Sequence, residues 1–378
     1  MKYVIKQKIS HDNLLFVNQI VDSVKDYQKI EMPSENVAEN QFFINLFSCL
    51  KGFYDLAILL FKIKNNSKST IYFIHDSFLY FHDKEYKINF YKNAELVSDK
   101  IFISYSKYKY VTKVEGVKVY NFGIIVNLLS KINLFCKQTK LNNFNEWLFV
   151  NDLFTSFLRG NSVFIPSYSN EVGLSLCLSK NRNKFFLIEV QHGNVINYQP
   201  YSFVANLKLI DKFWYKNLND KRYLEQNLYK NQNIIYQKLK TVNVEFGSNS
   251  TKFEILYISS YEFDGFHPVF LKFIEQKPKD LVVRLRLHPR QKNLQPNFIT
   301  ILENNGISYL IHDNTNWYDQ LPSNIIVISP LSSVIEEAVY LNLKTIIIDK
   351  LGKDRYDYLL VEKKCFYSND LLVFFDLK

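Results

Sequence analysis

The most constraining feature of this sequence is a regular alternation of short apolar runs with helix-like segments, which extends from Phe246 to the end of the chain. Short runs rich in β-branched residues, each followed by a longer helical pattern, are typical of βαβ units in a parallel sheet. The expected strands are Glu254–Ser259, Leu281–Leu287, Ser308–His312, Asn324–Ser329 and Lys344–Asp349. The expected crossover helices are Pro268–Gln276, Phe298–Asn305 and Ser332–Asn342. The C-terminal part of the chain is therefore expected to form an α/β domain.

The N-terminal part of the chain shows a similar but less regular pattern. The expected strands there are Ile71–His75, Ile101–Tyr105, Val117–Tyr120, Val163–Pro166 and Phe185–Val190. The expected helices are Gln41–Lys62, Ile124–Asn133 and Val172–Leu178. These runs predict a second α/β domain.

The boundary between the two domains is expected near residue 245. The segment Phe246–Ser250, with the sequence FGSNS, has the composition of a turn or linker. Residues 1–245 and 246–378 are then the two domains. The segment Ala205–Val244 just before this boundary shows no strand-like alternation, and we expect it to be helical and to lie at the surface.

Composition and motifs exclude several classes of protein. The chain of 378 residues is 47% hydrophobic and 22% charged, values that are typical of folded globular proteins and not of disordered ones. The N-terminal segment lacks the apolar core of a signal peptide, and no apolar run approaches the length of a membrane span. The four cysteines are far apart and form no C-x-x-C motif, so neither a zinc site nor a disulfide framework is indicated, and a reducing cytoplasm is the expected compartment.

The charge of the chain indicates an anionic partner. It carries 47 basic and 37 acidic residues, a net charge of +10, which favours nucleic acid, anionic lipid or phosphorylated small molecules. The segment Ala205–Val244 contributes 8 Lys or Arg against 3 Asp or Glu. Two interpretations of this segment stay open: a solvated basic face, or a surface that rests on anionic lipid.

The first candidate site is the sequence RLRLHPR, Arg284–Arg290, at the end of an expected strand. Ligands of open α/β sheets collect at the carboxyl ends of the strands. Arg286, His288 and Arg290 meet there beside a proline that stiffens the turn, and three such side chains suit a phosphate. The alternative is a basic strand end with a surface histidine.

The second candidate site lies in Ser329–Asp349, where a strand, a serine-rich turn, a helix and a strand follow in close order. Ser332 and Ser333 are expected to cap the helix, and free backbone N–H groups at a helix start attract anions. Glu337 follows Ser333 by one helical turn, so its carboxylate would accept from the hydroxyls of a ribose while the helix start holds the phosphate. The alternative is an ordinary capped helix.

The third candidate site is LIEVQHGN, Leu187–Asn194, in which an apolar strand runs into Gln191, His192 and Gly193. A histidine takes up a proton near neutral pH, so His192 is a candidate general base. The alternative is a histidine bonded only to local backbone. Weaker candidates are Ser169, Asn170, Glu171 and Gly173, then His75 and Asp76 after an earlier strand, and Glu262 and Asp264, which we expect to belong to a turn.

Several well-known signatures are absent from the sequence. It contains no G-x-x-x-x-G-K-[ST], G-x-G-x-x-G, H-E-x-x-H or G-x-S-x-G motif. These absences argue against P-loop NTPases, Rossmann dehydrogenases with the usual fingerprint, zincins and α/β-hydrolases.

Taken in chain order, a strand ending in QHG, a basic strand ending in HP and a helix that begins with paired serines resemble the motifs of GT-B glycosyltransferases from bacterial capsule and O-antigen biosynthesis. The HP dipeptide at 288 and the paired serines are similar to motifs of bacterial polysialyltransferases, and the QHG of Gln191–Gly193 is similar to the WHG-type motif of CDP-glycerol glycerophosphotransferases. The resemblance covers Leu187 to Asp349. The QHG differs from the WHGT of the second family and from the acidic motif of the first.

The resemblance implies a GT-B-like fold, with two Rossmann-like α/β domains that face each other across a cleft. Residues 1–245 would be the acceptor-side domain and residues 246–378 the donor domain. The implied reaction is an inverting, metal-independent transfer from a nucleotide sugar to a hydroxyl of a surface-polysaccharide or lipid-linked glycan acceptor, with no cofactor. His192, or failing that Glu171, would be the base. The residues implied in donor binding are Arg286, His288, Arg290, Ser332, Ser333 and Glu337.

The resemblance also bears on location and partners. We expect a cytoplasmic protein with peripheral contact at the anionic inner face of the plasma membrane, and no nucleic-acid partner. Three other hypotheses stay open: a CDP-glycerol-type glycerophosphotransferase, a non-catalytic protein that binds nucleic acid or other anions, and a non-catalytic scaffold in a polysaccharide assembly complex. The sequence leaves open which nucleotide and sugar are used, the acceptor and the number of subunits.

Overall fold

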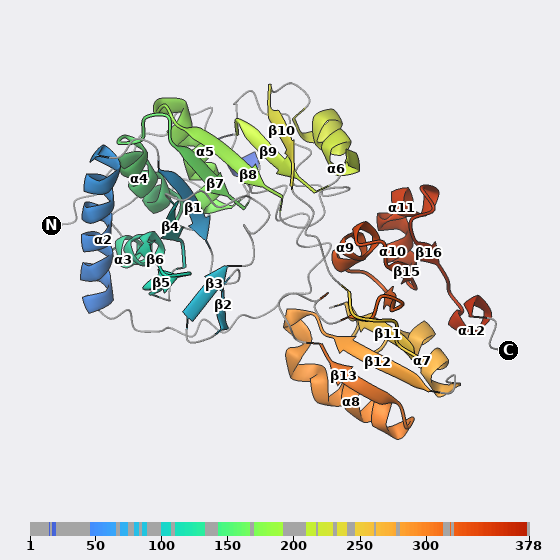
Figure 1. Cartoon of the computed structure of the whole chain (residues 1–378). Coiled ribbons are helices and arrows are strands. Elements are labelled where there is room, and N and C mark those ends of the chain that lie inside the picture. The colour runs from blue at the N-terminus through green and yellow to red at the C-terminus, as the bar shows by residue number, and fades with distance from the viewer. Residues whose placement is uncertain are drawn as a thin grey trace. The chain divides into compact units, whose positions relative to one another are not determined.

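The computed structural model divides the chain into two compact units, Met1–Thr241 and Val242–Lys378 (Figure 1). The residues that the structure describes are 15, 17–19, 46–65, 69–74, 79–82, 85–88, 100–106, 110–132, 143–166, 170–191, 209–216, 218–229, 233–239, 246–260, 262–276, 280–312, 318 and 321–375. None of the helices within these ranges is both long and apolar enough to cross a lipid bilayer.

The first unit is built on a sheet whose main part is parallel. Its parallel strands are β1 (Thr70–Ile74), β4 (Lys100–Ser104), β6 (Val117–Asn121), β7 (Ser162–Ile165), β8 (Phe186–Val190), β9 (Lys212–Tyr215) and β10 (Ile235–Lys238). Their order across the sheet is β10-β9-β8-β7-β1-β4-β6. The first strand, β1, therefore lies in the middle of the sheet. β4 and β6 follow on one side of it and β7 to β10 on the other, as in Rossmann-like folds, so the strand order reverses between β1 and β7.

Three short strands extend this sheet beyond β6. They are β2 (Leu79–His82), β3 (Glu85–Ile88) and β5 (Lys113–Val114). β2 pairs with β3, and β5 with β6, in antiparallel fashion. The sequence analysis did not predict these strands, because their sequences LYFH, EYKI and KV are short and are not runs of β-branched residues.

The helices with described bounds in the first unit are α2 (Leu46–Asn65), α3 (Phe122–Lys131), α4 (Phe144–Thr155), α5 (Glu171–Arg182), α6 (Leu218–Tyr223) and the π-helix η3 (Leu224–Leu228). An aromatic core lies between helices and sheet, where the ring of Phe122 is 6.5 Å from Phe73 and 5.3 Å from Phe154, edge to face. Edge-to-face geometry is favoured because the ring edge is positive and its face negative.

The prediction that Ala205–Val244 is helical and lies at the surface was only partly right, because α6 and η3 are helical but a strand lies on either side of them. The segment contains β9, α6, η3 and β10, which extend the parallel sheet beyond β8. Phe213, Trp214 and Tyr215 of β9 are buried. β9 was not predicted because its sequence, KFWY, is short, begins with a lysine and is followed by another one.

The second unit contains a parallel sheet of six strands. They are β11 (Phe253–Ile258), β12 (Leu281–Arg286), β13 (Ser308–Ile311), β14 (Ile326–Ser329), β15 (Lys344–Ile347) and β16 (Phe366–Tyr367). The order is β13-β12-β11-β14-β15-β16, which is the 3-2-1-4-5-6 order of the Rossmann fold. The reversal falls between β11 and β14.

The helices of the second unit cover this sheet. They are α7 (Pro268–Glu275), the 3₁₀ helix η4 (Pro289–Leu294), α8 (Gln295–Asn304), α9 (Val334–Tyr340), α10 (Lys350–Arg355), α11 (Asp357–Val361) and α12 (Leu371–Phe374). All five strands and all three helices expected here are present. The predicted class, α/β with two Rossmann-like domains, is confirmed by the strand orders of the two sheets.

The predicted linker at Phe246–Ser250 is packed against the second unit. Gly247 forms a β-bridge with Pro322. The backbone N–H of Ser250 donates to Asn324 Oδ1, and Asn324 Nδ2 donates back to the Ser250 carbonyl, both at 2.9 Å. The backbones of Gly247 and Ser250 thus bond to the second unit, so the segment is part of that unit and the interpretation as a linker was wrong.

Candidate functional site

The candidate site of the second unit lies at the carboxyl ends of β11 and β14. Where strand order reverses, the connections leave for opposite faces of the sheet, and a crevice opens between them. Ser260 lies just beyond β11, and Ser329 is the last residue of β14. The register pairs Leu256 with Val327 and Tyr257 with Ile328, which brings Ser329 opposite Ile258.

The hydroxyls of Ser260 and Ser329 are buried and have no hydrogen-bond partner among the described residues. The two residues are 2% and 0% exposed. A buried polar group without a partner costs about 1–3 kcal/mol, so most are bonded in native proteins. Both hydroxyls lie beside the point where the strand order reverses. A bound ligand or a trapped water there would supply their missing hydrogen-bond partners.

The turn after β12 is fixed to β11 by hydrogen bonds around Ser259. Ser259 Oγ donates to Gln291 Oε1 at 2.6 Å and accepts from the His288 backbone N–H at 2.8 Å. The Gln291 N–H donates to the His288 carbonyl at 2.8 Å, and Gln291 Nε2 donates to the Phe263 carbonyl. The backbone of the HP turn is therefore held rigidly at the carboxyl edge, next to Ser260.

A second histidine at this edge, His267, is part of a partly buried pair that the sequence analysis missed. Its Nδ1 accepts the N–H of Val269 at 3.3 Å, so Nε2 carries the proton and donates to Asp349 Oδ2 at 3.2 Å. Burial lowers the pKa of His267, and the carboxylate of Asp349 opposes this shift. The pair joins the loop after β11 to the loop after β15. Its only sequence signal was a second HP dipeptide.

The structure places the predicted residues of RLRLHPR at one edge. Arg286 ends β12, and His288 follows two residues later and is partly buried. Arg290 lies in η4, where only its backbone is described. Adjacent strands lie about 4.8 Å apart, and β12 and β14 flank β11. The ends of these two strands are therefore about 10 Å apart, a span that a nucleoside diphosphate bridges.

The serine turn after β14 differs in one respect from the prediction. Ser332 Oγ accepts the N–H of Val334 at 3.3 Å, and its carbonyl accepts from the hydroxyl of Tyr356 at 2.8 Å. Ser333 is exposed and its side chain caps nothing, because its backbone is already helical, with φ −61° and ψ −19°. The predicted cap at Ser333 was therefore wrong. Glu337 is partly buried in α9.

In the first unit, Glu171 is the first residue of α5, after β7. β7 neighbours β1 at the reversal point of that sheet. Asn170 caps α5, with Oδ1 accepting the N–H of Gly173 at 2.7 Å. Glu171 thus lies at the carboxyl edge of the first sheet. The predicted residues His192, Gly193, Ser169, His75 and Asp76 lie outside the described residues.

Gln191, the first residue of the QHG motif, is fixed at the carboxyl end of β8. Its Nε2 donates to Asp220 Oδ2 at 2.6 Å, its Oε1 accepts the N–H of Lys216 at 2.7 Å, and its own N–H donates to the Trp214 carbonyl at 2.9 Å. Both Gln191 and Asp220 are buried, at 3% and 0% exposed. The start of the motif is therefore tied to both β9 and α6.

Asp220 is a titratable residue that the sequence analysis missed. Burial raises the pKa of its carboxyl to about 7, and the bond from Gln191 and the charge of Lys216 oppose this shift. A carboxyl with such a pKa exchanges its proton near neutral pH, as general acids and bases do. Its signal in the sequence was weak, because it lies in the segment that was expected to be a featureless basic surface.

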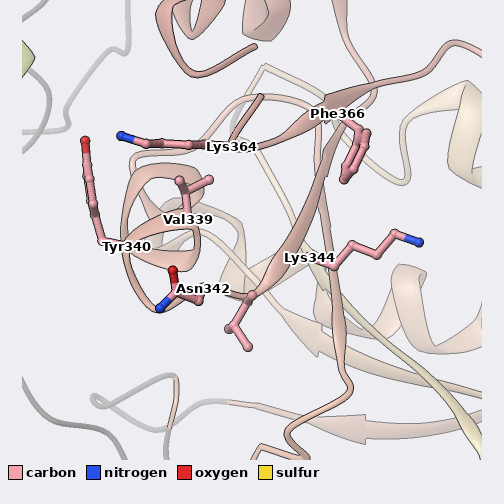
Figure 2. Close-up of a pocket in the computed structure, with 7 residues that line it drawn as sticks. Val339, Tyr340, Asn342, Lys344, Lys364 and Phe366 are labelled. Carbon is pink, nitrogen blue, oxygen red and sulfur yellow. The ribbon is translucent and has the colours of Figure 1, made fainter. Parts of the chain in front are cut away.

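The structure also contains a pocket of about 490 Å³ at the opposite edge of the second sheet (Figure 2). Figure 2 shows Tyr340 and Lys364 on one side of it and Lys344 and Phe366 on the other. The ammonium of Lys344 lies 5.2 Å from the ring centre of Phe374. Lys344 and Phe366 begin their strands, so the pocket lies at the amino ends and is separate from the candidate site.

Comparison with known proteins gives fold-level similarities at low sequence identity. No family model matches the chain, and no curated protein sequence matches it. Among solved structures, the lipopolysaccharide outer core galactosyltransferase WaaB in its apo form is similar at a TM-score of 0.43 and 8% identity, over 74% of this chain and 80% of that one. The MnaA–UDP structure from S. aureus gives 0.40 and 12%, over 74% and 79%. The UDP-GlcNAc 2-epimerase from Neisseria meningitidis bound to UDP-GlcNAc gives 0.41 and 10%, over 79% and 86%.

Proposed function

We propose that this protein is a glycosyltransferase of the GT-B type, with the nucleotide part of its donor bound at the carboxyl edge of the second sheet. The observation that carries the proposal is the pair of buried, unpartnered hydroxyls of Ser260 and Ser329. They flank the reversal point of a sheet with Rossmann order. That point is where doubly wound sheets bind nucleotides.

The residues beside these hydroxyls suit a donor that carries phosphate. Arg286 and His288 lie at the end of β12, and Ser332 at the turn after β14. Negative charge grows on the donor phosphate as the bond to the sugar breaks. Cationic and hydroxyl groups at fixed positions stabilise that charge more in the transition state than in the ground state. Glu337 would accept from the ribose hydroxyls.

The proposed reaction is an inverting transfer to a hydroxyl of a surface-polysaccharide or lipid-linked glycan. His192, or failing that Glu171, removes the proton of the acceptor hydroxyl. The acceptor oxygen forms a bond to the anomeric carbon from the side opposite the phosphate, and the electrons of the breaking bond stay on the phosphate oxygen. No divalent cation takes part, so the activity should persist in a chelating agent.

The test is a thermal-shift screen with CMP-, UDP-, GDP-, dTDP- and CDP-linked sugars and with CDP-glycerol. A ligand at 100 times its dissociation constant stabilises the folded state by about 2.7 kcal/mol, so a true donor raises the melting temperature measurably. The variant Ser260→Ala/Ser329→Ala should fold normally, since it loses hydroxyls that have no partner, and should bind the donor at least tenfold more weakly. The control is the exposed Ser323→Ala before β14, at the other end of the sheet, which removes a hydroxyl that donates to Asn249.

Each outcome has a defined meaning. If no nucleotide sugar shifts the melting temperature, or if the double variant binds as the wild type does, the proposal is wrong. A shift with CDP-glycerol alone favours the glycerophosphotransferase hypothesis. His192→Ala should keep donor binding and lose about 10² to 10⁴ in turnover, the usual contribution of a general base, whereas His288→Ala should lose donor binding and turnover together.

A further inference from the structure

Helix α2 presents an apolar stripe to solvent. Leu50, Tyr54, Ala57 and Phe61 follow one another at spacings of four, three and four residues and therefore lie along one face of the helix. The exposed fractions of Leu50, Tyr54 and Phe61 are 63%, 64% and 71%. Phe53, beside the stripe, is 41% exposed. Figure 1 shows α2 in blue at the outside of the first unit.

The opposite face of α2 is also apolar, but it is packed. Leu56, Leu59 and Ile63 are buried in the core of the first unit, and α2 packs against α3 and β6. A helix that covers a core in water normally has a polar outer face. Packing on the core therefore does not explain the outer stripe. A helix face that met only water would normally carry polar side chains at these positions.

The charges of α2 are all positive on its exposed side. Lys51, Lys62 and Lys64 are exposed. The only acidic residue of the helix, Asp55, is 1% exposed and is bonded on the inner side to the hydroxyl of Tyr110 at 2.7 Å and to the ammonium of Lys118 at 2.8 Å. An approaching surface therefore meets apolar side chains bordered by cations.

We propose that this face of α2 docks on the surface of an anionic lipid bilayer, with the helix axis in the membrane plane. Helices of this kind insert aromatic and aliphatic side chains at the boundary between headgroups and acyl chains, and their lysines reach back to the lipid phosphates. The aromatic side chains Phe53, Tyr54 and Phe61 suit that boundary, and Lys51, Lys62 and Lys64 supply the cations.

Charge favours lipid over a second copy of the chain on this face. A two-fold contact centred on the stripe would place Lys51 of one copy near Lys62 of the other, and like charges across an interface are unfavourable. An anionic bilayer instead complements all three exposed lysines. The segment Ala205–Val244, where the charge count suggested lipid contact, has its Lys221 paired with Glu225 at 3.3 Å and three buried aromatic residues in β9.

The proposal does not depend on the proposed function, because α2 belongs to the first unit and the candidate donor site to the second. It would also suit an enzyme whose acceptor is lipid-linked. The nucleotide thermal shift tests the donor site without lipid, and vesicle binding tests α2 without nucleotide. A negative result in one of these tests therefore does not contradict the proposal that the other one tests.

The test is co-sedimentation of the full chain with vesicles of phosphatidylcholine alone and with a third phosphatidylglycerol. We expect binding to the anionic vesicles, little binding to the neutral ones, and a decrease with added salt. Leu50→Gln/Phe61→Gln should weaken binding at least tenfold, and Lys62→Gln/Lys64→Gln should weaken it on anionic vesicles. The matched control is Leu351→Gln/Val361→Gln, at positions 61% and 71% exposed in the second unit.

All substituted side chains are exposed, so circular dichroism and the melting temperature should match those of the wild type. Equal binding to neutral and anionic vesicles, or equal binding by Leu50→Gln/Phe61→Gln and wild type, would overturn the proposal. So would a lipid-free dimer in sedimentation velocity that the same double variant dissociates, because a second copy would then be the occupant of the face.

Discussion

The buried carboxyl of Asp220 gives a sharp test of the structure through the pH dependence of stability. Asp220→Asn replaces it with a neutral side chain of the same shape, whose Oδ1 still accepts from Gln191 Nε2, a bond of 2.6 Å in the wild type. The substitution therefore removes the titration of this site and leaves its packing and this hydrogen bond in place.

The sign and size of the effect follow from the pKa. The pKa of Asp220 rises from its ordinary 3.8 to about 7 in the folded chain, so between these values the folded chain binds a proton that the unfolded chain does not. The free energy of unfolding must then fall as the pH rises through this window. One pKa unit corresponds to about 1.4 kcal/mol, so the wild type should lose about 3 kcal/mol relative to Asp220→Asn between pH 5 and 8.

Urea unfolding from pH 5 to 8, followed by tryptophan fluorescence, measures this difference. Trp147 and Trp214 both lie in the first unit, so a Trp317→Phe background restricts the signal to that unit. The control Asp264→Asn changes an exposed carboxylate in the second unit and should leave the pH dependence of this signal unchanged. Parallel curves for wild type and Asp220→Asn across this range would refute the argument.

Two further substitutions test the packing around the two sheets. In Gly352→Ala the new Cβ would meet the carbonyl oxygen of Pro330 at 2.0 Å, so we expect a loss of about 1–3 kcal/mol in stability and weaker donor binding, checked by calorimetry. In Asn121→Ala the buried N–H and C=O of Val111 both lose their hydrogen-bond partner, each now bonded at 2.9 Å. The free energy of unfolding in urea should therefore fall by about 3 kcal/mol. An unchanged unfolding midpoint for either variant would contradict the contact described for it.

Most of the fold could be predicted from local patterns. Runs such as LVVRLR at Leu281–Arg286 are long enough, and rich enough in β-branched residues, to identify a buried parallel strand. The strands β9 and β10 were missed because KFWY and IYQK each contain lysine and are not continuous β-branched runs, unlike the equally short IVIS of β14. What makes them strands is the pairing of β9 with β8, a contact between segments that are distant in the sequence.

The candidate site could be predicted only in part, for the same reason. His288 and Ser332 follow recognisable strands, so their position at the carboxyl edge follows from the sequence. Asp220 gains its raised pKa from burial, and the hydrogen bond from Gln191, 29 residues away, opposes that shift. His267 is fixed by Asp349, 82 residues away. Ser260 is notable only because its buried hydroxyl has no partner in the part of the chain that the structure describes. Such properties arise from tertiary contacts and leave no local signal.

The outermost strand of the second sheet, β13, has a consequence for the handling of the protein. Among the strands that the structure describes it pairs with β12 alone, it reads SYLI, and its Leu310 and Ile311 are 49% and 37% exposed. An edge strand without charged residues is a template for strand addition by another chain, and natural proteins usually prevent this with lysine or proline. Aggregation during concentration should therefore begin at β13, and a lysine in place of Leu310 is the change that should suppress it.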